Sequence, residues 1–342
     1  MRPRLPDEPL TPSAGGASPV ARHQVVVLGG GTGISAALRG IKESGAEVTA
    51  IVTVADDGGS SGRLRKDYHM LPPGDIRNCL VALSDGDPLL GELFNYRFED
   101  SILKGHSFGN LFLAVLTRLT GDFRTAVDRA RGLLGVSNRV IPSTSTRVVL
   151  VASHPDGTRS TGEQCISRGG KSIIGMELKP EPPCISDEIK GVIDDADLIV
   201  LGPGSLFTSL VPNLLVPGMT EALTAARAPV VLVANLATQP GETDGFLLAD
   251  HVRALREVGG LERIDGVVVN VAHVSDEVRA RYQESGASLI AIEAGTDVVE
   301  GVPVVAADLV RLTEDGFLRH DASRLAETLG GLLEAGVEAD RG

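Results

Sequence analysis

The sequence is poor in several residue types that mark particular classes of protein. It has no Trp, only 3 Cys, and an aromatic content of 3%. Cys79, Cys165 and Cys184 form no Cys-x-x-Cys pair and lie too far apart for a zinc knuckle. We therefore interpret them as reduced thiols and predict no bound metal from them. No run of about 18 apolar residues is present, so the sequence predicts no membrane span.

Positive charge is also scarce. Lys and Arg number 32 against 45 Asp and Glu, which gives a formal net charge of −13. A general nucleic-acid binder needs a basic face, so we expect no nucleic-acid partner. A local basic pocket for a phosphorylated small molecule remains compatible with this charge.

Glycine is the residue in excess. The chain of 342 residues contains 41 Gly, about 12%, against a usual content of about 7%. No collagen-like period is present, so we expect the excess in loops. Residues 1–22 hold five of the 19 prolines and predict a disordered tail. We expect a single domain over 23–330 and a short tail over 331–342.

The hydrophobic pattern predicts an α/β fold with a Rossmann-like, doubly wound and mainly parallel sheet. The apolar run 25–28 leads through a glycine loop into a helical pattern, and a second β-rich run follows at 48–54. Further strands are predicted at 198–201, 230–233, 267–269 and 302–305. Between these halves we expect a helical insertion at about 75–135 and a small antiparallel hairpin at about 146–178.

The first glycine loop, Gly30-Gly31-Thr32-Gly33, matches G-x-G-x-x-A with Ala36 as its last position. Glycines allow the backbone to approach a phosphate at a helix N-terminus. The carboxylate of Asp56 follows at nearly the spacing of a ribose-binding residue. A nicotinamide-dependent dehydrogenase is therefore one interpretation, and a purely structural tight turn is another.

The segment 53–65 is unusually rich in Gly, Ser and charged residues. Asp56 and Asp57 precede a glycine-serine loop that contains Ser60 and Ser61, and Arg63 follows. These groups could wrap a phosphorylated ligand, and the two carboxylates could bind ribose hydroxyls or Mg²⁺. The alternative is a surface turn that caps a helix.

Three later segments also place small polar residues after strands or before helices. In 105–110, His106 could act as an acid or base or serve as a structural group, and Asn110 could recognise a ligand. The segment 202–209 predicts a second anion cradle without the Lys of a P-loop. We expect the first loop and this cradle to face one pocket, with Asn235 and the stretch 239–243 on its far wall. The residues predicted from these segments are Asn110, Gly204, Ser205, Thr208 and Asn235.

The sequence shows no arrangement of nucleophile and base. It has no G-x-S-x-G, no H-E-x-x-H, and no Cys with a nearby His partner. Signals for binding therefore outnumber signals for chemistry. We name no catalytic residue and leave open whether the protein is an enzyme, with the balance toward a binding protein.

Long ordered motifs resemble the bacterial gluconeogenesis factor (YvcK) family, within the CofD-like superfamily of 2-phospho-lactate transferases. They are VTVADDGGSSGRLR at 52–65, LPPGDIRNCLVAL at 71–83, GHSFGNL at 105–111, LGPGSLFTS at 201–209 and QPGETDG at 239–245. The resemblance spans about residues 24–330.

The resemblance implies a cytoplasmic protein needed for normal cell shape and for growth on gluconeogenic carbon sources. It also implies binding of UDP-sugars, notably UDP-N-acetylglucosamine, with no assigned reaction. The family residues that hold the ligand match Tyr282 and Arg319 here. Many members have a Thr after the Arg-His-Asp segment, as a candidate phosphorylation site, whereas this chain has Ala322.

Our leading hypothesis is a UDP-sugar-binding regulatory protein that links cell-wall precursor supply to central carbon metabolism. A transferase of phosphorus-containing groups, with Mg²⁺ held by Asp56 and Asp57, is the second hypothesis. The dehydrogenase is the third. A regulatory protein partner and a homodimer are both left open.

Overall fold

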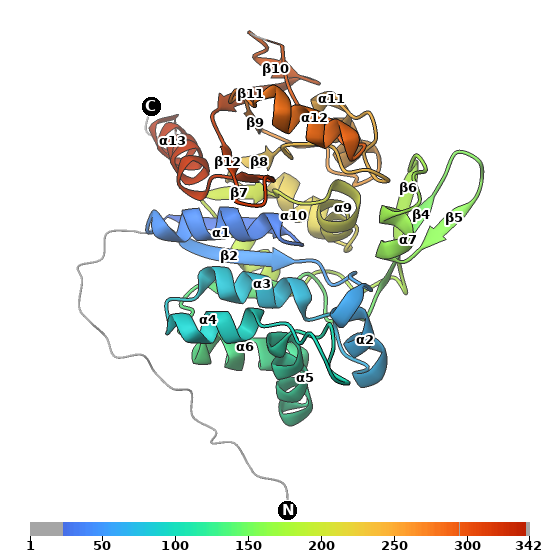
Figure 1. Cartoon of the computed structure of the whole chain (residues 1–342). Helices are drawn as coiled ribbons and strands as arrows, with labels where there is room; N and C mark the ends of the chain where they lie inside the picture. Colours follow the sequence, from blue (N-terminus) through green and yellow to red (C-terminus); the bar gives the residue numbers. More distant parts are fainter. Residues whose placement is uncertain (1–22, 294, 340–342) are drawn as a thin grey trace, which may run out of the picture.

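The computed structural model describes residues 23–293 and 295–339, so the tail expected at 1–22 lies outside the described residues. Its centre is an eight-stranded sheet in the order β10-β11-β9-β8-β7-β1-β2-β3, parallel throughout except for the β10–β11 pair (Figure 1). The strands are β1 (Gln24–Gly29), β2 (Glu47–Val52), β3 (Arg139–Pro142), β7 (Leu198–Leu201), β8 (Val230–Val233), β9 (Gly266–Asn270), β10 (Val298–Val299) and β11 (Val302–Ala307).

Strand order reverses between β1 and β7. From β1 the chain proceeds outward to β2 on one side, and the later strands β7, β8 and β9 follow on the other. The central strands are buried on both faces, as their uninterrupted Val, Leu and Ile residues predict. The doubly wound parallel fold is confirmed, and ligands in such folds bind outside the carboxyl ends of the strands at this reversal.

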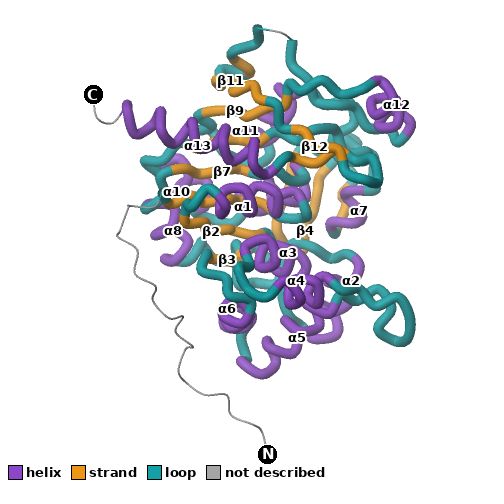
Figure 2. The backbone as a smooth tube through the Cα atoms, turned by 60° about the vertical axis from the view of Figure 1, so that its left-hand side comes forward, coloured by secondary structure: helices purple, strands orange, loops and turns teal. Residues whose placement is uncertain are grey.

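Helices cover the sheet and form a lower lobe. α1, α3 and α13 pack together, and α8 packs against α10 in a separate group (Figure 2). The helices are α1 (Gly33–Glu43), α2 (Gly59–Tyr68), α3 (Gly74–Leu83), α4 (Pro88–Asn95), α5 (Phe108–Thr120), α6 (Phe123–Leu133), α7 (Glu163–Ser167), α8 (Asp187–Asp194), α9 (Val211–Leu214), α10 (Met219–Ala225), α11 (Leu248–Glu257), α12 (Asp276–Glu284) and α13 (Ala322–Ala339), with a π-helical turn at Leu206–Leu210.

The contact between α1 and α13 depends on a glycine. A Cβ on Gly40 of α1 would collide with the backbone carbonyl of Ala322, where α13 begins. The absence of a side chain therefore lets the last helix pack directly on the helix that follows the first glycine loop. α13 continues to Ala339, so a helix extends into the segment 331–342 that we expected to be a tail.

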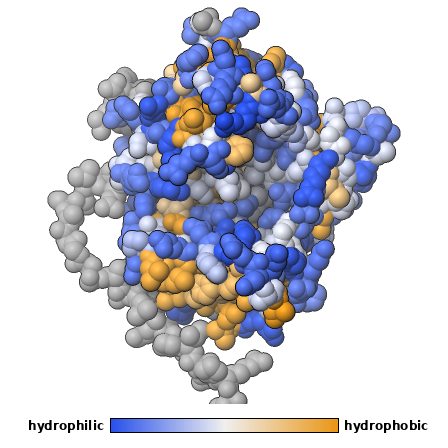
Figure 3. Space-filling model, in the orientation of Figure 1, coloured by the Kyte–Doolittle hydropathy of each residue, from blue (hydrophilic) through white to orange (hydrophobic). Residues whose placement is uncertain are grey.

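The helical insertion consists of α3 to α6, in agreement with the prediction for about 75–135. Its outer surface is apolar, and Figure 3 shows hydrophobic side chains gathered on the lower part of the molecule. The large exposed apolar residues there lie on α4, α5 and α6 and between α4 and α5: Leu89, Leu93, Tyr96, Ile102, Val115, Leu119 and Leu133.

Two small antiparallel sheets complete the fold. The hairpin predicted at about 146–178 is present, and it gains a third strand in the order β5-β4-β6. Its strands are β4 (Val149–Ser153), β5 (Arg159–Thr161) and β6 (Gly175–Lys179). The second sheet, β12 (Val310–Leu312) with β13 (Leu318–His320), was not predicted. None of the helices that the structure describes is long and apolar enough to cross a membrane.

Candidate ligand-binding site

A cavity of about 250 Å³ lies at the reversal of strand order. The loops that leave β1, β7 and β8 form three of its walls, and β13 with α12 forms the fourth. The structure thus brings both predicted glycine loops to one cavity. The predicted residues that line it are Gly30, Gly31, Thr32, Gly33, Gly204, Ser205, Asn235, Tyr282 and Arg319.

The two glycine loops pack against each other through their backbones. A Cβ on Gly33 would lie 2.7 Å from the carbonyl oxygen of Pro203, and one on Gly204 would lie 3.3 Å from the carbonyl oxygen of Gly30. Gly31 adopts a φ of +66°, which favours glycine. The floor of the cavity therefore consists of closely packed backbone, where a bound group meets peptide N–H donors.

Two helical segments begin at this floor without side-chain caps. The side-chain hydroxyls of Thr32, before α1, and of Ser205, before the π-helical turn, accept no hydrogen bond from the N–H groups of the first helical turn. Side-chain caps do occur on other helices, with Asp87 before α4, Ser107 before α5 and Ser186 before α8, although α2 and α3 also lack one. The first N–H groups of α1 are thus left for another acceptor, whereas the N–H of Phe207 in the π-helical turn is bonded to Glu242.

Tyr282 and Arg319 form the wall opposite the glycine loops. The hydroxyl oxygen of Tyr282 accepts a hydrogen bond of 2.9 Å from the N–H of Leu318, the residue before Arg319. Arg319 donates to the carbonyl of Leu318 and makes no salt bridge within the described residues. Tyr282 therefore positions the strand that presents a guanidinium without a carboxylate partner.

Two further side chains line the cavity and were not named individually in the predicted site, Gln239 from the loop after β8 and His320 from β13. Gln239 donates from Nε2 to the Ser205 hydroxyl at 2.8 Å, while its Oε1 has no hydrogen-bond partner among the described atoms. His320 contacts the carbonyl of Ala234 through Nε2 at 3.2 Å, and burial lowers its pKa to about 4. His320 is thus neutral at pH 7, and Gln239 offers a free acceptor.

The carboxylates of the second motif do not line this cavity. Asp56 accepts from the N–H of Gly58 at 2.7 Å, and Asp57 accepts from the N–H of Gln164 at 3.1 Å. Both bonds fall at the starts of helices, α2 and α7, where a carboxylate satisfies otherwise unpaired donors. Asp56 thus closes a turn onto the residue before α2, and Asp57 bonds the first turn of the distant α7.

Asp56 and Asp57 belong to a group of four carboxylates that includes Asp75 and Glu163. Burial raises the pKa of Asp75 to about 6, although Asp75 accepts a hydrogen bond from the backbone of Gly31. Burial and the nearby Asp56 raise the pKa of Glu163 well above its usual range. The group therefore carries fewer than four negative charges at neutral pH, and through Asp75 it supports the first glycine loop from behind.

The other predicted residues hold neighbouring loops together. Asn110 donates to the Ser60 hydroxyl at 3.3 Å, and Ser60 contacts His106 Nδ1 at 3.1 Å. Arg63 donates to the carbonyl of Lys104, and Ser61 lies buried beside Gly74. Thr208, which lies in the π-helical turn, donates a hydrogen bond of 3.0 Å to the carboxylate of Glu242. None of these residues lines the cavity.

Sequence reasoning missed residues whose position depends on long-range packing. Glu163 lies on a short helix after the small antiparallel sheet, and no local pattern connects it with Asp56. His320 follows Arg319 directly, so the same motif could have indicated it. Gln239 lies in the stretch 239–243 that we expected on the far wall, and the structure places it there.

Comparison with known proteins assigns the family. The model of the family described as 2-phospho-L-lactate transferase CofD matches residues 25–310. The gluconeogenesis factor of Halalkalibacterium halodurans is 44% identical over 309 residues, which cover 90% of this chain and 96% of the relative. The gluconeogenesis factor of Bacillus subtilis is 44% identical over 314 residues, which cover 92% of this chain and 99% of the relative.

The fold has a solved counterpart. A crystal structure of a Bacillus halodurans protein superposes with a TM-score of 0.86 and 43% sequence identity. The match covers 90% of this chain and 99% of that one. The arrangement of strands and helices described above is therefore shared with a structure determined by experiment.

Proposed function

The chain belongs to the CofD family and, within it, to the gluconeogenesis factors, and we propose from this premise that it is a cytoplasmic regulator that binds UDP-N-acetylglucosamine. The observation that carries the proposal is the cavity at the strand reversal. The uncapped start of α1 borders the cavity on one side, and Arg319 lines it on the other.

These donors suit a diphosphate. Backbone N–H groups at helix N-termini favour negative charge, and a guanidinium can grip two phosphate oxygens at once. Arg319 makes no salt bridge within the described part of the chain, although the charge of the nearby Asp315 interacts with it, so its guanidinium is open to a phosphate group. The overall charge of −13 does not oppose binding, since the local field at these donors is positive.

The space beside the cavity suits the rest of a nucleotide-sugar. A second cavity of about 460 Å³ adjoins the first, with Leu236 and Leu318 on the walls of both. It lies at the carboxyl ends of β9 and β11 and has Asn270 and Arg279 on its walls. One cavity can accept the diphosphate while the other accepts a uridine or sugar group.

Thermal unfolding and calorimetry with UDP-N-acetylglucosamine test the proposal. Ligand at about 100 times its Kd should stabilise the protein by roughly 2.7 kcal/mol. Arg319→Ala should weaken binding at least tenfold, because one charge-assisted contact to phosphate is lost. Arg39→Ala, at an exposed arginine on α1, is the matched control and should bind normally. An unchanged melting temperature at millimolar UDP-N-acetylglucosamine would refute the proposal.

The regulatory part of the proposal concerns cell-wall precursor supply and growth on gluconeogenic carbon sources. It is tested by complementation of a Bacillus subtilis strain that lacks its own gluconeogenesis factor. The wild-type chain should restore cell shape and growth on such carbon sources, and Arg319→Ala should not. Equal rescue by both chains would separate the cellular role from ligand binding.

The group of four carboxylates favours a second candidate function, a transferase of phosphorus-containing groups. Asp75 connects this group with the first glycine loop through the N–H of Gly31. Within the described residues, however, no three acidic, His or Cys side chains converge with the geometry of a metal site, so we derive no step through Mg²⁺. This candidate predicts Mg²⁺-dependent turnover of a nucleotide substrate that Asp57→Asn abolishes.

A further inference from the structure

A third cavity, of about 430 Å³, lies at the carboxyl end of the edge strand β3 and shares no residue with the candidate ligand site. Its walls are the loop after β3, the first turns of α6 and α8, and the residues that follow α2. Its volume falls within the range of small-molecule pockets, about 300–1,000 Å³. No function described above uses it.

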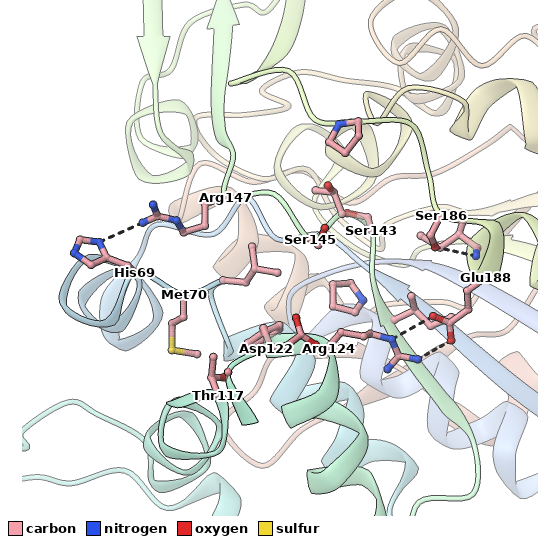
Figure 4. Close-up of a pocket in the computed structure, with 18 of the residues that line it drawn as sticks. His69, Met70, Thr117, Asp122, Arg124, Ser143, Ser145, Arg147, Ser186 and Glu188 are labelled. Carbon is pink, nitrogen blue, oxygen red and sulfur yellow. Dashed lines mark hydrogen bonds and ion pairs between the residues drawn. The ribbon is translucent and has the colours of Figure 1, made fainter. Parts of the chain in front are cut away.

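Arg147 supplies the unbalanced positive charge of this cavity. Its Nη1 contacts Nδ1 of His69 at 3.4 Å, and it makes no salt bridge with a residue that the structure describes. The other cation, Arg124, is neutralised by Glu188 at 2.6 Å and by Asp128 at 2.8 Å. Figure 4 shows the Arg147–His69 contact and the Arg124–Glu188 ion pair on opposite sides of the cavity. An anionic ligand would therefore bind on the Arg147 side.

Two hydroxyl groups accompany Arg147 on the same loop. Ser143 and Ser145 line the cavity at alternate positions before Arg147, and Figure 4 places them between the Arg147–His69 contact and the Arg124–Glu188 ion pair. The hydroxyls of Thr117 and Ser186, by contrast, are already bonded to the backbone at Leu113 and Ile189. One loop thus presents a guanidinium and two available hydroxyls, all of which can donate to phosphate oxygens.

The remaining walls define the rest of the ligand. Met70, Leu71 and Ile141 offer apolar surface for a carbon skeleton. Asp122 also lines the cavity, and its hydrogen bonds with Thr125 lower its pKa, so it is charged at neutral pH. A single negative group can bind Arg147, whereas a polyphosphate would also meet the Asp122 carboxylate.

We propose that this cavity is a second binding site, for a small organic phosphate ester with one phosphate group held by Arg147, Ser143 and Ser145. It is separate from the nucleotide-sugar site, so a phosphorylated metabolite and a UDP-sugar can bind the same molecule at once. Such a site would give the protein a second chemical input from metabolism.

Isothermal titration of the full chain with glucose 6-phosphate and with glycerol 3-phosphate tests the proposal. At least one ester should bind at millimolar concentration or better, while glucose and glycerol should not. Arg147→Ala should weaken ester binding about tenfold or more, because a charge-assisted contact is lost. The double variant Ser143→Ala/Ser145→Ala should also weaken it, and Arg39→Ala should bind normally.

The outcomes separate this site from the proposed function. Arg147→Ala should keep its affinity for UDP-N-acetylglucosamine, and Arg319→Ala should keep its affinity for the ester. Failure of both esters to bind, or equal binding by wild type and Arg147→Ala, overturns the proposal. Tighter binding of gluconate or of inorganic phosphate than of either ester overturns the assignment to organic phosphates.

Discussion

Replacement of Gly33 by alanine is the most direct test of how the two glycine loops build the candidate site. Gly33 begins α1 with an ordinary φ, so alanine suits its backbone conformation. The added Cβ would lie 2.7 Å from the carbonyl oxygen of Pro203 and 3.3 Å from the Cα of Gly204. Both neighbours are backbone atoms and cannot rotate away, so the second loop must move.

The size of the effect follows from these distances. The contact to Pro203 is about 0.7 Å shorter than the 3.4 Å at which ordinary contact begins. Overpacking of this kind costs about 1–3 kcal/mol, and alanine returns up to about 1 kcal/mol through its helix propensity. We expect a net loss of up to about 3 kcal/mol. We also expect at least tenfold weaker binding of UDP-N-acetylglucosamine, because a shift of this size misplaces hydrogen-bond donors to phosphate.

Urea unfolding gives the stability, and calorimetry gives the Kd. Gly191→Ala is the control, because Gly191 lies inside α8 with no atom within 4 Å of a built Cβ. That variant should gain about 0.5–1 kcal/mol and bind normally. If Gly33→Ala is as stable as wild type and keeps its Kd, the loops are not in the contact described and the reasoning is refuted.

Three further predictions concern stability around the site. Tyr282→Phe removes the acceptor of the Leu318 N–H, so urea unfolding should show a loss of about 1 kcal/mol and calorimetry a weaker Kd for the UDP-sugar; an unchanged Kd would argue against a positioning role. His320 titrates at pKa about 4 when folded and near 6.5 when unfolded, so its contribution is complete above pH 6.5 and falls by about 3 kcal/mol as the pH drops to 4. His320→Gln should flatten that part of the stability-against-pH curve, and an unaltered curve would contradict the assignment. Gly40→Ala should separate α1 from α13 and lower the melting temperature by several degrees in calorimetric scans; a melting temperature equal to that of wild type would exclude the close packing described.

The sequence predicted the central strands because each is an unbroken apolar run, as at 25–28 and 198–201. It missed β3, whose four residues include Arg139 and end in Pro142. The two glycine loops, each placed after such a run, indicated where a ligand would bind, but the reversal of strand order between β1 and β7 is known only from the structure. The β12–β13 hairpin, by contrast, has short strands with mostly exposed residues, and no periodic pattern marks it.

The candidate site was predictable only where it depends on local sequence. Gly31 and Gly204 lie in loops that follow strands. Because parallel strands end at the same edge of a sheet, the two loops are expected at that edge. Asp56 also follows a strand, but its carboxylate accepts a hydrogen bond from the N–H of Gly58, the residue before α2, and does not line the cavity. Arg319 comes from a hairpin far along the chain, and only the family resemblance indicated it. The spacing of residues cannot report such long-range placement.

The candidate site joins the two ends of the described chain, because residues 30–33 form its floor and Arg319 forms its opposite wall. A ribosome that has synthesised the first 300 residues has therefore produced every glycine of the floor but no guanidinium to face it. β13 and α13, which pack against α1, also emerge last. A nascent chain thus cannot assemble this site until synthesis is nearly complete, and chains that terminate early would lack the Arg319 wall.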